Sequence, residues 1–316
     1  MTTANPNLGS LGLGADGTTT ADVEPARYGE VFDRGYKHYE GRRLGRGHAV
    51  WALVRYSIKR AMGIKKSWTA KIIPIVLYLA VTVIALIPIA IEAFIGDRFD
   101  SSEEILPYEA FFVMIFVIQG IFVATIAPEM LCGDRRENVL TLYFSRAITR
   151  LDYLLAKLGA AALLTLTISF APAFVLWLGR QLLADSPLTA MKDNAGDLGR
   201  IVIAGVLIAF YLGAGGLMIS SFTGRASIAV AIIVIGFVVL EALMVILREN
   251  VLDGAPQSYS VFLSPAFTVA GLVTNLFNPD HQERMLDLEA WVYASGMGVV
   301  ILLAFAIMYL RYVPDE

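Results

Sequence analysis

The segment from Ala127 to Ala161, APEMLCGDRRENVLTLYFSRAITRLDYLLAKLGAA, concentrates charge between two strongly apolar stretches of the chain. Such charges can make charge-assisted contacts with a partner protein, while interleaved apolar side chains fill a groove on it. In a short helix over residues 134–145, Val139, Leu142 and Tyr143 share one face and have no core of their own to pack against. The alternative is a helix lying on the membrane surface. The candidate contact residues are Asp134, Arg135, Arg136, Glu137, Val139, Leu142, Tyr143, Arg146 and Arg150.

The end of this segment carries a signal for the start of the next helix. Thr149, followed three residues later by Asp152, fits a capping box, in which each side chain accepts a backbone hydrogen bond from the other residue. Lys157 is then expected near the membrane surface, where its apolar stem lies along the hydrocarbon and its ammonium group reaches water.

Polar side chains are rare inside the apolar stretches, and two of them are candidates for a path through the membrane. Gln119 lies in the middle of one stretch and Glu241 in the outer half of another. A charge near the bilayer centre costs about 2.5–3.5 kcal/mol, so Glu241 is expected to face a cavity or a partner. Gln119 also fits an interhelical hydrogen bond. Glu241 also fits a place near the headgroups or an ion pair with Arg248.

Motifs for nucleotide, metal or acyl-transfer chemistry do not occur in the sequence. GIKKS (63–67) lacks the glycine-rich loop of a phosphate-binding GxxxxGK[ST] motif. The histidines His38, His48 and His281 have no metal-ligand spacing, and neither HExxH nor GxSxG is present. We therefore expect no catalytic residue, no metal site and no cofactor in this chain, which is not itself an enzyme.

Composition identifies the elements that must position these residues. Of the 316 residues, 57% are hydrophobic and 17% are charged, whereas a soluble domain carries about a quarter charged residues. A helix that crosses a bilayer needs roughly 20 apolar residues. Six windows meet this requirement, so we predict an all-α, polytopic membrane protein with six transmembrane helices. The windows are 72–95, 109–131, 153–178, 200–221, 226–247 and 290–310.

The distribution of basic residues predicts the orientation of these spans. If the N-terminus is cytoplasmic, nineteen of the 25 Lys and Arg residues fall on the cytoplasmic side, as the positive-inside rule requires. The segment before the first span, RYSIKRAMGIKKSWTAK, is basic, and the loop after that span, GDRFDSSEEILPYE, is acidic. We therefore expect both termini in the cytoplasm and the protein in the plasma (inner) membrane.

The residues before the first span fall into two parts. Residues 1–26 are rich in Gly, Thr, Ala, Asn and Pro and are expected to form a disordered cytoplasmic tail. Residues 27–71 are expected to form a cytoplasmic strap that ends in an amphipathic basic helix at the inner membrane surface. An ordinary solvent-facing helix is the alternative. The residues assigned to the membrane surface are Trp51, Arg55, Lys59 and Arg60.

A short apolar helix is predicted on the outer side, between the fifth and sixth spans. Ser264 fits an N-cap and Pro265 the first helical position. A helix from there to Phe277 is about 20 Å long, which is too short to cross the membrane. We expect a re-entrant or interfacial helix; a seventh span, the alternative, places the C-terminus outside.

Together these features resemble the permeases of type-2 ABC exporters. After its second span that family carries an acid and an arginine, a leucine-containing run, a turn ending in arginine, and then a Tyr-Leu-x-Ala-Lys pattern. The same order occurs here as DR at 134–135, VLTL at 139–142, SRAITR at 145–150 and YLLAK at 153–157. The sequence departs at Asn138, where the family often has glycine, and at Ala147, where it often has proline. FLSPAFTVAGL, after the fifth span, is also similar, and the likeness covers roughly residues 45–312.

The resemblance implies partners and a mechanism. Such a permease pairs with a second copy or a close relative and with two separate ABC ATPase subunits, which bind ATP and Mg. A coupling helix at about 134–145 is then a lever moved by the ATPases, and the interfacial helix braces them. The short outer helices, one of which has Ser264 as N-cap and Pro265 at its first position, gate the exit of the transport path. The chain is thus expected to be the permease subunit of an ATP-driven exporter, with a transmembrane domain over 72–311 in the lipid bilayer and no nucleic-acid partner.

Two other functions stay open at this point. An ion-coupled carrier or channel acting alone requires Glu92, Gln119 and Glu241 to converge on one cavity. A non-transporting membrane scaffold that recruits an ATPase has the same inner segment but no path through the membrane. The aliphatic and aromatic spans favour a hydrophobic or amphipathic cargo.

Overall fold

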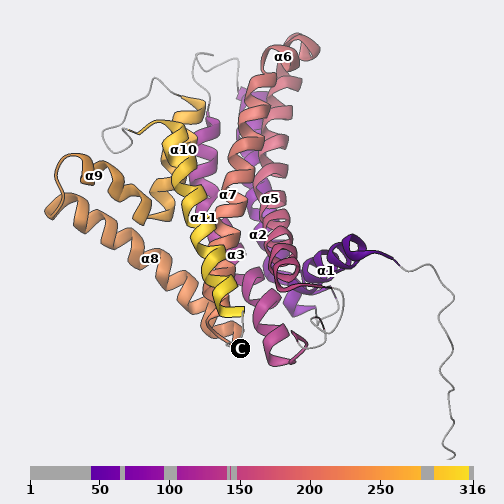
Figure 1. Ribbon diagram of the computed structural model, residues 1–316. Coiled ribbons are helices and arrows are strands. Elements are labelled where there is room, and N and C mark those ends of the chain that lie inside the picture. Colours follow the sequence, from indigo (N-terminus) through magenta and orange to yellow (C-terminus); the bar gives the residue numbers. More distant parts are fainter. Residues whose placement is uncertain are drawn as a thin grey trace, which may run out of the picture. The chain divides into compact units, whose positions relative to one another are not determined.

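The computed structural model describes residues 44–64, 68–95, 105–140, 143, 148–278 and 288–312. The predicted tail (1–26) and residues 27–43 and 65–67 of the predicted strap lie outside these residues. Within them the chain forms helices and no strands (Figure 1). The helices are α1 (Arg46–Ala61), α2 (Thr69–Ile95), α3 (Tyr108–Arg136), α5 (Arg150–Leu183), α6 (Pro187–Asp193), α7 (Ala195–Ser221), α8 (Ala226–Asn250), α9 (Ala255–Tyr259), the 3-10 helix η2 (Ser260–Leu263), α10 (Pro265–Phe277) and α11 (Ala290–Tyr312).

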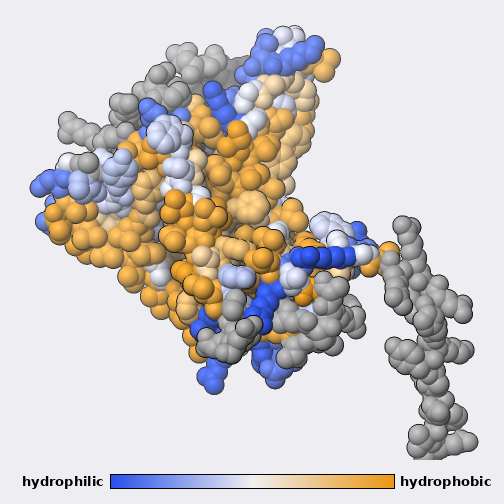
Figure 2. Space-filling view, in the orientation of Figure 1, coloured by the Kyte–Doolittle hydropathy of each residue, from blue (hydrophilic) through white to orange (hydrophobic). Residues whose placement is uncertain are grey.

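Six of these helices are long and apolar enough to cross a membrane: α2, α3, α5, α7, α8 and α11. The prediction of an all-α polytopic protein with six transmembrane helices is therefore confirmed. Apolar side chains cover the middle of the helical bundle, and hydrophilic ones gather at its ends (Figure 2). All six helices extend beyond their predicted windows, most of all α3, which continues past residue 131 to Arg136, and α5, which continues past residue 178 to Leu183. Backbone hydrogen bonding does not end where the apolar window ends.

The helices α3, α5 and α7 form the core of the bundle. In their most apolar windows 61%, 56% and 61% of the residues are buried, against 22%, 11% and 22% in α2, α8 and α11. Small residues make this close packing possible. A Cβ atom added at Gly216 on α7 would lie only 2.5 Å from Cγ1 of Val123 on α3. A Cβ atom at Gly213 would lie 3.5 Å from the Cβ of Ala161 on α5.

The two ends of the bundle carry different elements. One end is called the α1 end. There Arg311 Nε donates to the carbonyl of Ser221 at 2.9 Å, and the ring centres of Tyr153 and Tyr312 lie 5.8 Å apart. The C-termini of α7 and α11 therefore meet the start of α5 there. At the opposite end, the α6 end, Trp177 Nε1 donates to the carbonyl of Asn194 at 3.1 Å. The first and last described helices thus share one end, as an even number of spans requires.

The short helices between α8 and α11 form a bend. Residues Pro256–Leu263 and Pro265–Phe277 meet at 111°, so the chain turns back instead of continuing as one straight span. Ser264 is fully buried at the bend, and its hydroxyl accepts a hydrogen bond from the amide of Phe267 at 3.1 Å. The predicted helix with Ser264 as N-cap and Pro265 at its first turn is confirmed.

The helix α1 packs against α3 and α5 by a face that includes Leu53, Val54, Ser57 and Ala61, all of which are buried. Three of the residues predicted at the membrane surface, Trp51, Arg55 and Lys59, are exposed. Arg60 is a correction to that prediction. Its side chain is only 10% exposed, because it turns toward the carboxylates at the end of α3.

Candidate ATPase-coupling site and membrane-embedded polar residues

Asp134, in the last turn of α3, is the centre of a buried charged cluster at the α1 end. Its carboxylate is fully buried and lies 2.7 Å from Nζ of Lys157 on α5. Nη1 of Arg60, on α1, lies 3.0 Å from the other carboxylate oxygen. The hydroxyl of Tyr153 donates to Asp134 at 3.0 Å. Together with Glu137, these residues are called the Asp134 cluster.

The charges in the Asp134 cluster balance. Lys157 also donates to the carbonyl of Met130 at 2.9 Å, and Nη2 of Arg60 lies 2.8 Å from Glu137. Burial opposes the charged form of Arg60, but the carboxylates of Asp134 and Glu137 outweigh burial and raise the pKa of Arg60. A buried charge is tolerated only when it is paired and hydrogen-bonded in this way. The cluster therefore joins α1, α3 and α5 at one point.

The end of α3 differs from the predicted helix over 134–145. Asp134, Arg135 and Arg136 belong to α3 itself, and the helix breaks at Asn138, whose φ is 51°. Asparagine is one of the few residues other than glycine that adopt this left-handed conformation readily. Helical hydrogen bonding then resumes, since the amide of Tyr143 donates to the carbonyl of Val139 at 3.1 Å.

Tyr143 lies beside the Asp134 cluster. Its ring lies 5.9 Å from that of Tyr153. Burial, and then the nearby carboxylate of Asp134, raise the pKa of Tyr143 to about 12. The phenol is therefore neutral at physiological pH, and the half-buried ring covers one side of the cluster.

The far end of the same loop is tied to the start of α1. The predicted capping box is present, because Asp152 accepts from the amide of Thr149 at 2.9 Å and Thr149 Oγ1 accepts from the amide of Asp152 at 3.2 Å. Nε and Nη2 of Arg46 lie 2.8 and 2.9 Å from the Asp152 carboxylate. The helix α1 thus contacts both ends of the loop between α3 and α5, through Arg46 at its start and Arg60 near its end.

Arg135 points away from that loop, toward the end of α7. It donates a hydrogen bond to the carbonyl of Ser221, which also accepts from Arg311, and its guanidinium lies 5.8 Å from the centre of the Tyr312 ring. Cationic side chains stabilise the unsatisfied carbonyls at a helix C-terminus. Arg135 therefore fastens α3 to α7 and α11.

The other predicted contact residues differ in exposure. The side chains of Arg136 and Glu137 are 76% and 47% exposed. Val139 and Arg150 are half-buried. Leu142 and Arg146 lie outside the described residues. The exposed charges next to α3 therefore belong to Arg136 and Glu137, whereas Asp134 and Arg135 are engaged inside the protein.

Gln119 connects two core helices. Its Nε2 donates to Oγ of Ser169 on α5 at 2.9 Å, and both side chains are fully buried. Its Oε1 has no hydrogen-bond partner among the described residues. Gln119 thus makes an interhelical hydrogen bond, which the sequence offered as the alternative to a position on a transport path through the membrane.

Glu241, on α8, lies at the N-terminus of α10. Its carboxylate accepts from the hydroxyl of Ser264 and from the amide of Ala266, the latter at 2.9 Å. An anion at a helix N-terminus is stabilised by the free amides and by the helix dipole. Glu241 therefore holds α10 to α8.

An apolar cavity of about 280 Å³ lies between α7, α8 and the bend at Ser264. Its walls include Leu212, Phe237 and Pro265. Gln119 and Glu241 do not line it, and Glu92 forms an ion pair of 3.2 Å with Arg180. Among the described residues, the convergence of these three polar groups that a lone carrier requires is absent.

Residues 19–315 match the sequence profile of a family described as "ABC-2 family transporter protein". The chain belongs to this family. It is therefore a multi-pass permease subunit of an ABC transporter, and it associates with ABC ATPase subunits. The resemblance noted in the sequence is confirmed. A search of curated proteins found no significant match.

Several residues that build the site in this ABC-2 permease were not foreseen. Lys157 was expected to reach water at the membrane surface, but it is 1% exposed and pairs with Asp134. Tyr153 and Ser221 were not predicted to take part. The sequence did indicate that Tyr153 and Lys157 act together, because they are four residues apart and share a helix face. It did not indicate that this face contacts Asp134.

Proposed function

We propose that this ABC-2 permease is the membrane subunit of an ATP-driven exporter and that the loop between α3 and α5 couples it to two ATPase subunits. The observation that carries the proposal is the attachment of α1 to both ends of that loop. Arg46 binds Asp152 at one end, and Arg60 binds Asp134 at the other. A displacement of the loop is therefore passed to α3 and α5, two of the three core helices.

The contact with the ATPase is assigned to the exposed part of the loop. Arg136 and Glu137 supply exposed charge, and Tyr143 presents one side of a half-buried ring. Leu142 lies outside the described residues and is proposed to add apolar surface for a groove on the partner. Asp134 and Arg135 act as positioning residues, because their side chains are engaged with α1, α5 and α7. In this proposal the α1 end faces the cytoplasm, and the ATPases bind ATP and Mg.

The transport path is proposed to lie between this chain and a second copy or a close relative. The cargo is proposed to be hydrophobic or amphipathic, which is supported by the apolar cavity between α7 and α8. The bend at Ser264 and Pro265 is the proposed outer gate, and Glu241 holds it closed by capping α10.

Co-purification with a co-expressed cognate ABC ATPase tests the coupling site. The variant Arg136→Glu/Leu142→Asp reverses an exposed charge and removes an apolar contact. Leu188→Asp/Lys192→Glu is the matched control, since both residues are exposed on α6 at the opposite end. We expect the first variant to bind the ATPase at least about tenfold more weakly and the control to bind like wild type. Equal binding by all three chains contradicts the proposal.

A further inference from the structure

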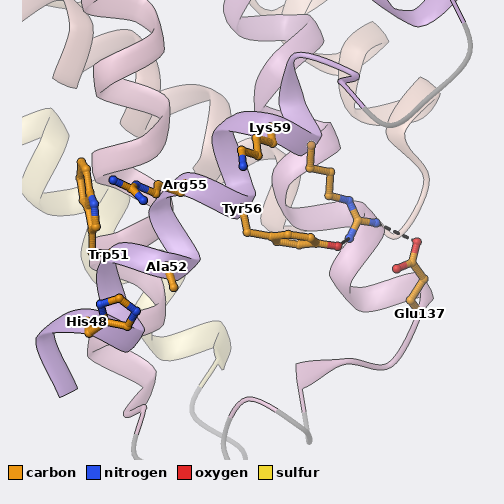
Figure 3. Close-up of a pocket in the computed structure, with 8 residues that line it drawn as sticks. His48, Trp51, Ala52, Arg55, Tyr56, Lys59 and Glu137 are labelled. Atoms are coloured by element: carbon orange, nitrogen blue, oxygen red, sulfur yellow. Dashed lines mark hydrogen bonds and ion pairs between the residues drawn. The ribbon is translucent and has the colours of Figure 1, made fainter. Parts of the chain in front are cut away.

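A groove of about 460 Å³ runs along the outward face of α1 (Figure 3). The small side chain of Ala52 leaves room between the aromatic rings of Trp51 and Tyr56. Arg55 and Lys59 lie on the same face, and Glu137 lies across the groove from them. Two residues of the Asp134 cluster, Arg60 and Glu137, also line the groove, whereas Arg55 and Lys59 do not belong to the cluster.

The groove carries an excess of positive charge. Arg55 and Lys59 are exposed, and neither has a carboxylate partner among the described residues. The guanidinium of Arg55 lies 5.5 Å from the centre of the Trp51 ring. The charge of Glu137 is balanced by Arg60 at 2.8 Å. Two unpaired cations next to aromatic surface suit an anionic group attached to an apolar body, and phosphate is an anion that both arginine and lysine bind.

The position of α1 places the groove at the level of lipid headgroups. α1 ends at Ala61, and the first membrane-spanning helix begins at Thr69. Trp68, directly before that helix, is 73% exposed, and the ammonium of Lys71 lies 5.9 Å from its ring centre. Exposed tryptophan flanked by lysine is typical of the membrane–water interface. Phospholipid headgroups supply the phosphates at this level of the membrane.

We propose that this groove binds the phosphate of an anionic phospholipid. Arg55 and Lys59 hold the phosphate, and Trp51 and Tyr56 flank the glycerol and the upper part of the acyl chains. The groove borders the proposed ATPase contact at Glu137, but the residues that hold the lipid, Arg55 and Lys59, are not part of that contact, and lipid binding requires only that the chain lies in a membrane.

Native mass spectrometry of the purified full chain, titrated with phosphatidylglycerol or phosphatidylcholine, tests this site. We compare wild type with Arg55→Gln/Lys59→Gln, which removes the cations, and with Ala52→Phe, which fills the groove but keeps them. Lys192→Gln/Arg200→Gln removes two exposed cations at the α6 end and is the control. Loss of the two cations should weaken phosphatidylglycerol binding roughly tenfold. Ala52→Phe should weaken it similarly, and the control should bind like wild type.

Four results overturn the proposal. Equal lipid affinity in all chains, or an equal loss in the control, shows that the groove is not selective. Wild-type affinity in Ala52→Phe shows that the cations act only as diffuse surface charge. Displacement of the lipid by inorganic phosphate or glycerol 3-phosphate shows a small-anion site. Variants that lose the ATPase but keep the lipid show a protein contact. The lipid titrations are measured on the permease alone and do not depend on ATPase coupling, whereas the last result requires co-purification of the same variants with the ATPase.

Discussion

Asp134 carries its charge in a place that water does not reach, and its neighbours make that charge tolerable. Lys157 and Arg60 supply two cations and Tyr153 a hydroxyl, all within 3.0 Å. A buried ion pair adds little stability over a well-packed apolar pair, but breaking it leaves an uncompensated buried charge. The Asp134 cluster therefore fixes the positions of three helices more than it contributes net stability.

Replacing Asp134 alone should therefore destabilise the protein much more than replacing Asp134 and Lys157 together. We expect Asp134→Leu to lower the free energy of unfolding by about 3–5 kcal/mol, because Lys157 loses its counter-ion in a buried site. Adding Lys157→Met should restore most of this loss, since Arg60 keeps Glu137 as its partner. A double-mutant cycle from unfolding curves in detergent measures both effects. Additive losses in the double variant would contradict a direct pair.

The backbone at Asn138 makes a second prediction at the residue scale. With φ at 51°, Asn138→Gly should keep the break at the end of α3, whereas Asn138→Val should destabilise it by about 1–3 kcal/mol. ATPase activity of the assembled complex and the unfolding midpoint of the permease are the measurements. The loop geometry described above is wrong if valine is tolerated as well as glycine.

Among the helices, α8 is the least buried of the six spans, and polar groups attach it to the bend that follows. Glu241 binds Ser264 and the amide of Ala266. Arg248 and Gln257 exchange hydrogen bonds through their side chains and carbonyls at 3.0 and 3.1 Å. Because α8 has little apolar packing and these polar contacts connect it to the bend, we expect α8 and α10 to move together.

Glu241 should control the stability of the first turn of α10. Glu241→Leu removes the acceptor of the Ala266 amide, so we expect faster hydrogen–deuterium exchange over residues 264–270, by roughly tenfold for a loss of about 1.4 kcal/mol. Glu241→Gln retains an acceptor oxygen and should change exchange much less. Equal protection in wild type and Glu241→Leu would show that α10 does not depend on this contact.

At the scale of the whole permease, the sidedness of the bundle decides which surface the ATPases reach. The loop between α3 and α5, α1 and the end of α11 share the α1 end, and α6 lies at the other. The excess of basic residues near α1 favours a cytoplasmic position for that end.

Cysteine labelling tests this orientation with little disturbance, because Cys132 is the only cysteine of the chain and is buried. In a Cys132→Ser background, Lys192→Cys should react with a membrane-impermeant maleimide in intact cells. Arg136→Cys should react only after the membrane is opened, since the proposed orientation places its side chain on the cytoplasmic side. The opposite labelling pattern would show that the α1 end lies outside the cell, where the loop could not contact the ATPases.

The sequence by itself determined the features that depend on short stretches of chain. Hydrophobic length is enough to define six spans, because the bilayer sets the number of apolar residues that a helix needs. The capping box at Thr149 and Asp152 and the N-cap at Ser264 involve residues three apart, so their geometry is local. The order of residues after the second span was enough to indicate the family.

Only the tertiary structure decided which side chains meet across helices. Arg60 and Asp134 are 74 residues apart, Arg135 and Ser221 86 apart, and Glu241 and Ser264 23 apart. In an all-round apolar span, hydrophobic periodicity does not show which face turns inward, because lipid and protein interior are equally apolar. The partner of each buried charge is set by how the helices pack. That is why Lys157 and Arg60 were expected at the membrane surface and are instead the counter-ions of Asp134.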